Sequence, residues 1–145
     1  MTEMSSPKMP SPKMPANVRD VVGRFSPQAQ NTFHQIRDLV FLVAGQTDGV
    51  GRIDETLKWG EPSYLTSASK SGTTIRVCSP KNAPDKIGIY VNCKTSLVDT
   101  YRELYGDELT LVGTRAIMLQ TNQALPVEPI KHAIALALTY HKSKK

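Results

Sequence analysis

The chain has few of the features that identify secreted, membrane-spanning or metal-binding proteins. It has 145 residues but only two cysteines, Cys78 and Cys93, and only three histidines. Residues 1–15 contain no apolar run of the kind that a secretory signal needs. No stretch approaches the ~20 consecutive apolar residues of a membrane-spanning helix. These absences favour a cytoplasmic protein with reduced thiols and no part in the membrane.

Common catalytic and metal-binding motifs are also absent. There is no Cys-x-x-Cys, His-x-x-x-His or EF-hand spacing, and no nucleophile elbow. His132 and His141 lie on one predicted helix, but their spacing puts them on roughly opposite sides of it. The glycine-dense segment 45–51 follows a predicted helix rather than a strand and has no lysine, unlike a phosphate-binding loop. We therefore expect a protein that is not an enzyme of a familiar class.

The folded part of the chain has almost no excess of one charge sign over the other. The net charge is +5, but residues 17–141 have 13 basic and 12 acidic residues. Most of the excess positive charge therefore belongs to the two ends. A nearly neutral domain argues against a dedicated nucleic-acid surface, which would need clustered lysine and arginine.

The two ends differ from the rest of the chain in composition. Ser-Pro-Lys-Met-Pro occurs twice in succession, at 6–10 and 11–15, and the four prolines predict an extended, disordered leader. We assign residues 1–16 to this tail, 17–141 to a single domain, and 142–145 to a basic C-terminal tail.

Hydrophobic periodicity predicts an α+β fold. Ser26 and Pro27 are typical of the start of a helix, which is expected to end near Gly45. Ser71-Gly72 is a hairpin-turn signal. The predicted helices cover residues 17–25, 27–45, 97–105 and 126–141, and the predicted strands cover residues 53–59, 62–67, 73–79, 86–93 and 115–120. We expect an antiparallel sheet of about five strands packed against the N- and C-terminal helices.

If the third and fourth strands pair, alternation places Cys78 and Cys93 on opposite faces, which disfavours a disulfide.

The segment 55–64 contains the only tryptophan, two carboxylates, a lysine and a Gly-x-Pro turn. With the run 115–119, which precedes Leu125-Pro126 and a helix, this segment resembles the YdhG-like family, a bacterial domain of unknown function. The resemblance covers about residues 27–140 and is carried by Glu55, Leu57, Lys58, Trp59, Gly60, Pro62 and Tyr64. It implies an antiparallel sheet packed against N- and C-terminal helices. Some family members are described as frataxin-like iron chaperones.

Glu55 is the most unusual residue in this segment. By strand alternation it shares the apolar face with Ile53, Leu57 and Trp59, where an unpaired carboxylate would be costly. By the same alternation, Arg115 lies on the same face as the apolar residues of its own strand. Because Glu55 and Arg115 are then both on the apolar face, we predict a Glu55–Arg115 contact beside a buried Trp59. This contact is either a structural ion pair or part of a ligand pocket.

The second face of the sheet is the alternative location for a ligand. We expect Tyr64, Arg76 and Tyr90 to lie on this second face. Lys58 is expected to lie in solvent, and Pro62 and Gly60 are expected to form a turn between strands. The face would bind a partner or a small molecule only if the helices leave it uncovered. Our candidate ligand-binding residues are Glu55, Lys58, Trp59, Pro62, Tyr64, Arg76, Tyr90 and Arg115.

Three functions follow from these residues. The first is a non-enzymatic cytosolic binding module for a protein or small ligand that the sequence does not name; a homodimer is one such arrangement. The second is an iron chaperone that uses the carboxylates of Asp54, Glu55 and Glu61, although the helices lack the acidic ridge of frataxin-like proteins. The third is an enzyme with a site around Glu55, Trp59 and Arg115.

Overall fold

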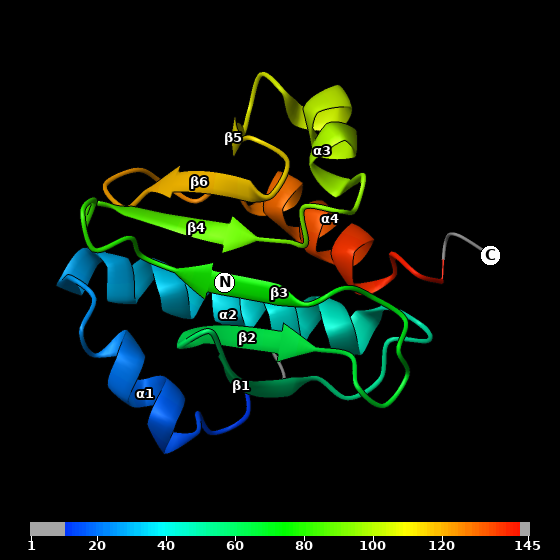
Figure 1. Ribbon diagram of the computed structural model, residues 1–145, viewed down its shortest axis with the longest axis horizontal. Helices are drawn as coiled ribbons and strands as arrows, with labels where there is room; N and C mark the ends of the chain where they lie inside the picture. The colour runs from blue at the N-terminus through cyan, green and yellow to red at the C-terminus, as the bar shows by residue number, and fades with distance from the viewer. Residues whose placement is uncertain (1–10, 143–145) are drawn as a thin grey trace, which may run out of the picture.

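The computed structural model describes residues 11–142, and these form an α+β fold, as predicted (Figure 1). In the described part of the chain one antiparallel sheet of six strands has the order β1-β2-β3-β4-β6-β5. The strands are β1 Asp54–Lys58, β2 Glu61–Leu65, β3 Ile75–Cys78, β4 Lys86–Tyr90, β5 Thr110–Val112 and β6 Ala116–Gln120. The helices are α1 Ala16–Val22, α2 Pro27–Gln46, α3 Leu97–Tyr105 and α4 Val127–Leu138.

The longest helix, α2, begins where the sequence predicts. The Ser26 hydroxyl accepts a hydrogen bond from the backbone N–H of Ala29 at 3.1 Å, and Pro27 occupies the first helical position. Apolar residues then recur every three or four positions and are fully buried: Ala29, Phe33, Ile36 and Val40. This helical periodicity gives α2 one apolar stripe, which packs against the sheet and against α4.

In the part of the chain that the structure describes, helices cover one face of the sheet and leave the other without a helix. Figure 1 shows α2 and α4 behind the strands, α1 beside the edge strand β1, and no helix in front of the strands. The covered face, here called the helix face, carries the apolar residues of alternate strand positions, and these are buried: Ile75, Val77, Ile87, Ile89, Ile117 and Leu119. The opposite face, here called the open face, carries the intervening positions, and no helix of residues 11–142 covers it.

Two sequence predictions about the strands were incomplete or wrong. The strand β5 was not predicted, because three residues are too few to show alternation. Ser71-Gly72 does not form a two-residue hairpin, because residues 66–74 connect β2 to β3. This loop is instead fixed to α4, since the Ser71 hydroxyl donates to the carbonyl of Leu138 at 2.7 Å. Gly72 lies so close to α4 that a Cβ atom there would be 2.4 Å from backbone atoms of Leu138.

The structure describes residues 11–16 of the predicted N-terminal tail, whereas residues 1–10 lie outside the described residues. The second Ser-Pro-Lys-Met-Pro copy contacts α2. The Ser11 hydroxyl donates to the Asp38 carboxylate at 2.6 Å, and Met14 packs against the core. Of the predicted C-terminal tail, the structure describes Lys142, whose ammonium group donates to the carbonyl of Asp48 at 2.9 Å.

Candidate functional site

Glu55 lies on the helix face, as strand alternation predicts, but its partner is Arg37 of α2 rather than Arg115. The guanidinium of Arg37 donates two hydrogen bonds to the Glu55 carboxylate, at 2.6 and 2.7 Å. The two side chains are only 6% and 5% exposed. The predicted Glu55–Arg115 contact is therefore wrong. Arg115 is exposed and precedes β6, and it faces a groove on the open face.

Further contacts complete this buried ion pair. The Tyr64 hydroxyl donates to Glu55 at 2.9 Å, and Arg37 also donates to the backbone carbonyl of Pro12. The guanidinium of Arg37 lies 5.0 Å from the ring centre of Phe41. Burial and then the nearby Glu55 charge raise the pKa of Tyr64, and the hydrogen bond to Glu55 raises the pKa of Arg37. Because both charges are enclosed and hydrogen-bonded, this cluster is structural rather than a vacant site.

Trp59 lies on the surface, which contradicts its predicted place in the core. Its side chain is 90% exposed. The alternation of β1 ends at Lys58, so it does not extend to Trp59. Trp59 and Gly60 instead form the two-residue turn between β1 and β2, with φ values of 56° and 75°. Two successive positive φ values are the requirement of a type I′ hairpin turn.

The middle of the open face is formed by Arg76 and its neighbours. Arg76 donates to the Glu61 carboxylate at 2.8 Å, and its guanidinium lies 5.7 Å from the ring centre of Tyr90. The Tyr90 ring lies over Gly88, where a Cβ atom would be 2.6 Å from the ring. The glycine therefore gives the ring room to lie flat on the sheet. Burial, followed by the nearby Cys78 and Glu61, raises the pKa of Tyr90.

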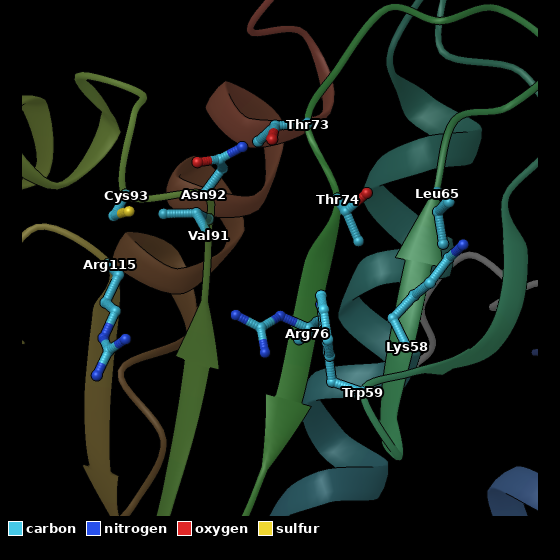
Figure 2. A pocket seen from close by; sticks show the side chains of 10 residues that line it. All are labelled: Lys58, Trp59, Leu65, Thr73, Thr74, Arg76, Val91, Asn92, Cys93 and Arg115. Carbon is cyan, nitrogen blue, oxygen red and sulfur yellow. The ribbon is translucent and has the colours of Figure 1, made fainter.

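A groove of about 430 Å³ lies on this face (Figure 2). It is called here the cationic groove, because three of its lining residues are basic and none is acidic. Its lining residues are Lys58, Trp59, Leu65, Thr73, Thr74, Arg76, Val91, Asn92, Cys93 and Arg115. Figure 2 shows Arg76 in the middle, Arg115 on one side of it, and Trp59 and Lys58 on the other. Neither Lys58 nor Arg115 forms an ion pair with any carboxylate in residues 11–142.

A second hollow of about 570 Å³ adjoins the turn at Trp59, and Trp59 lines both hollows. It is called here the apolar pocket, because it lies among several apolar side chains. The residues that line it are Val21, Arg24, Phe25, Ser26, Trp59, Gly60, Glu61, Cys78, Ser79, Pro80, Lys81 and Pro84. The Arg76–Glu61 ion pair connects the two hollows, since Arg76 lines the first and Glu61 lines the second.

Both cysteines are free thiols, in agreement with the prediction that they form no disulfide. The reasoning behind that prediction fails, however, because β4 ends at Tyr90 and its alternation does not extend to Cys93. Cys93 is exposed in the cationic groove, whereas Cys78 is half-buried in the apolar pocket. Burial, and secondarily Glu61, raises the pKa of Cys78 to about 11.

The three carboxylates predicted to hold iron do not come together. Each pairs with a different arginine: Asp54 with Arg52 at 3.3 Å, Glu55 with Arg37, and Glu61 with Arg76. Across residues 11–142 the structure contains no group of three or more His, Cys, Asp or Glu side chains that could hold a metal ion. The arrangement therefore gives the iron hypothesis no support.

The predicted ligand-binding residues divide between the two faces. Four of them line the cationic groove and a fifth lies beside Arg76: Lys58, Trp59, Arg76, Arg115 and Tyr90. Tyr64, which was expected on the open face, lies with Glu55 on the helix face. Pro62 pairs with Leu57 on β1 and is buried, so it does not reach the groove.

Sequence reasoning missed several lining residues of the groove, notably Thr74 and Asn92. Thr74 is two residues before Arg76, and Asn92 is two residues after Tyr90. Alternation along the predicted strands 73–79 and 86–93 assigns both to the face of Arg76 and Tyr90, although β3 begins at Ile75 and β4 ends at Tyr90. Polar side chains at strand ends are common, however, and alternation alone does not show that they line a hollow.

Comparisons of the chain with protein-family models, with curated proteins and with solved structures find no match. The resemblance to the YdhG-like family thus stays a prediction. In residues 11–142 the structure also has no helix of the length and apolar character needed to cross a membrane.

Proposed function

We propose that this protein is a non-enzymatic cytosolic module that binds a small organic anion in the cationic groove. One observation supports the proposal above the others. Three basic side chains and no carboxylate line a groove of about 430 Å³ on a sheet face that the helices leave uncovered. A groove of this volume is within the range of small-molecule sites.

The charges in the groove suit an anion. Arg115 and Lys58 form no ion pair with any carboxylate that the structure describes, so their charges are available to a ligand. Arginine presents a planar fork of donors that matches carboxylate and phosphate groups. Basic groups that line a concave surface also concentrate an anion more strongly than the same groups on a convex one.

The lining residues favour binding over catalysis. No histidine, aspartate or glutamate lines the cationic groove, so it lacks the usual general bases. Glu55, Trp59 and Arg115, on which the enzyme hypothesis depends, lie apart: Glu55 is enclosed on the helix face and the other two line the groove. The hydrogen bonds of Glu55 are already used by Arg37 and Tyr64.

The test is a thermal-unfolding screen of the full chain with organic phosphates and carboxylates. A ligand at one hundred times its Kd stabilises the folded state by about 2.7 kcal/mol, which raises the melting temperature measurably. We expect a rise with at least one of these anions and a much smaller rise for Arg115→Gln. Arg19→Gln is the matched control, because it removes the same charge from an exposed position on α1.

Two results would overturn the proposal. One is the absence of any shift with organic anions, which would favour a protein partner or a second copy of the chain on the open face. The other is an equal shift in wild type and Arg115→Gln, which would place the anion outside the cationic groove.

A further inference from the structure

The backbone at Trp59 is in a conformation that tryptophan rarely adopts. Its φ is 56°, and in residues 11–142 Lys70 is the one other non-glycine residue with a positive φ. Both central residues of a type I′ turn need positive φ, so asparagine, aspartate or glycine usually occupies them. A large aromatic residue in this position stores strain, and strain of this kind is concentrated at functional sites.

Exposure adds a second cost at the same residue. Trp59 is 90% exposed, so its ring gains little from packing against the protein. A single exposed apolar residue needs no explanation by itself. An exposed aromatic ring on a strained turn, where a smaller residue would fit better, indicates that the side chain has a use outside the core.

The surroundings of the ring indicate what it contacts. Trp59 lines the cationic groove together with Arg76 and Arg115, and it also lines the apolar pocket. Only β4 lies between β3, which carries Arg76, and β6, which Arg115 precedes. Their backbones are therefore about 10 Å apart. Figure 2 shows the Arg76 side chain extended toward the β6 side of the groove, the Arg115 side chain directed along β6, and Trp59 next to Arg76. Arginine side chains are long and flexible enough to reach one anionic group across this separation.

We infer that the ligand of the cationic groove is a planar organic anion, whose ring stacks on Trp59 and whose phosphate or carboxylate is held by Arg76 and Arg115. This inference rests on the proposed function and adds the class of ligand. Offset stacking of two aromatic rings adds to the free energy that burial of the ring alone provides, and a puckered ring of the same size lacks this addition. An aliphatic anion of equal charge is then a poorer ligand.

Matched pairs of small anions test this inference. The probes are phenyl phosphate with cyclohexyl phosphate, and benzoate with cyclohexanecarboxylate, each titrated into the full chain and followed by amide shifts in two-dimensional NMR spectra. Aromatic stacking is worth about 0.5–1.5 kcal/mol beyond the area that the ring buries, so we expect the planar member to bind roughly 2- to 13-fold more tightly. The pair that shows this difference identifies phosphate or carboxylate as the anionic group.

Variants at residue 59 separate the contribution of the indole ring to binding from its contribution to the stability of the fold. Trp59→Asn removes the ring and suits the turn, so we expect the planar preference to disappear while the protein unfolds at the same or a higher temperature. Trp59→Phe keeps a ring and should retain most of the preference. Arg115→Gln should weaken the binding of both members of each pair.

The outcomes distinguish this inference from the proposed function. Equal binding of planar and puckered anions, both weakened by Arg115→Gln, would keep the anion site and overturn stacking on Trp59. An unchanged preference in Trp59→Asn would also overturn stacking. Binding of no probe, or binding that Arg115→Gln leaves unaltered, would overturn the proposed function itself.

Discussion

Each face of the sheet carries an arginine–glutamate pair, joined by two hydrogen bonds on the helix face and by one on the open face. On the helix face, Arg37 and Glu55 are 6% and 5% exposed and meet at 2.6 Å. On the open face, Arg76 and Glu61 are 27% and 29% exposed and meet at 2.8 Å. An aromatic ring lies beside each guanidinium, Phe41 in the first pair and Tyr90 in the second.

Burial gives the two pairs different roles. The buried pair has hydrogen bonds from Tyr64 and to Pro12, so it has no free capacity for a ligand. The pair on the open face is partly exposed and connects two hollows, so we expect an incoming anion to compete with Glu61 for Arg76. Identical residue types therefore form an enclosed pair on one face and a partly exposed pair on the other.

The largest effect should come from removing the buried carboxylate. Glu55→Gln leaves the Arg37 guanidinium buried without a counter-charge, which typically costs about 3–5 kcal/mol of stability. Urea denaturation followed by circular dichroism measures the change. Glu61→Gln is the matched control, and because its pair is partly exposed the expected loss is under about 1 kcal/mol. Equal losses in the two variants would contradict the contrast between the faces.

A smaller effect of opposite sign is expected in ligand binding. Glu61→Gln removes the competitor of the anion at Arg76, so affinity for an organic anion should increase by about five-fold, which corresponds to about 1 kcal/mol. Titration calorimetry with phenyl phosphate measures it. Weaker binding to Glu61→Gln than to wild type would show that Glu61 positions Arg76 for the ligand rather than competing with it.

A further effect concerns alkaline pH and Cys78. Its pKa is raised from 9.0 to about 11, mainly by burial. Between these values the unfolded chain loses the thiol proton while the folded chain keeps it, so stability falls as pH rises from about 9 to about 11. Urea denaturation at several pH values should show a shallower fall for Cys78→Ser than for wild type. A Cys78→Ser curve parallel to wild type would contradict this assignment.

The sequence predicted the fold better than the site, for reasons that particular residues make clear. Strand alternation correctly placed Glu55 on the apolar face, because alternation depends only on local backbone geometry. Its partner Arg37 is on a helix, and the pairing of a strand with a helix is set by tertiary packing. The sequence of α2 predicts that Ile36 is buried and that Arg37, the next residue, lies on the surface. In the structure both residues are buried, and no local pattern in the sequence indicates this for Arg37.

For Trp59 the error is the reverse of that for Arg37, because Trp59 was expected in the core and is exposed. A lone tryptophan at the end of an apolar strand pattern is usually core, and that pattern predicted burial. The turn signal was already present in Gly60, but a two-residue turn that includes the tryptophan itself is rare. The open face was predicted only conditionally, since no local pattern shows whether a helix covers a sheet on one side or on both.

Fluorescence of Trp59 is the most direct test of the central claim that the open face binds an organic anion. Trp59 is the only tryptophan in the chain, so the emission reports on the cationic groove without labelling. Titration of the full chain with phenyl phosphate should give a saturable change in emission, and Arg115→Gln should need a much higher concentration for the same change. Emission that stays constant throughout the titration, or that responds equally in wild type and Arg115→Gln, would contradict the account.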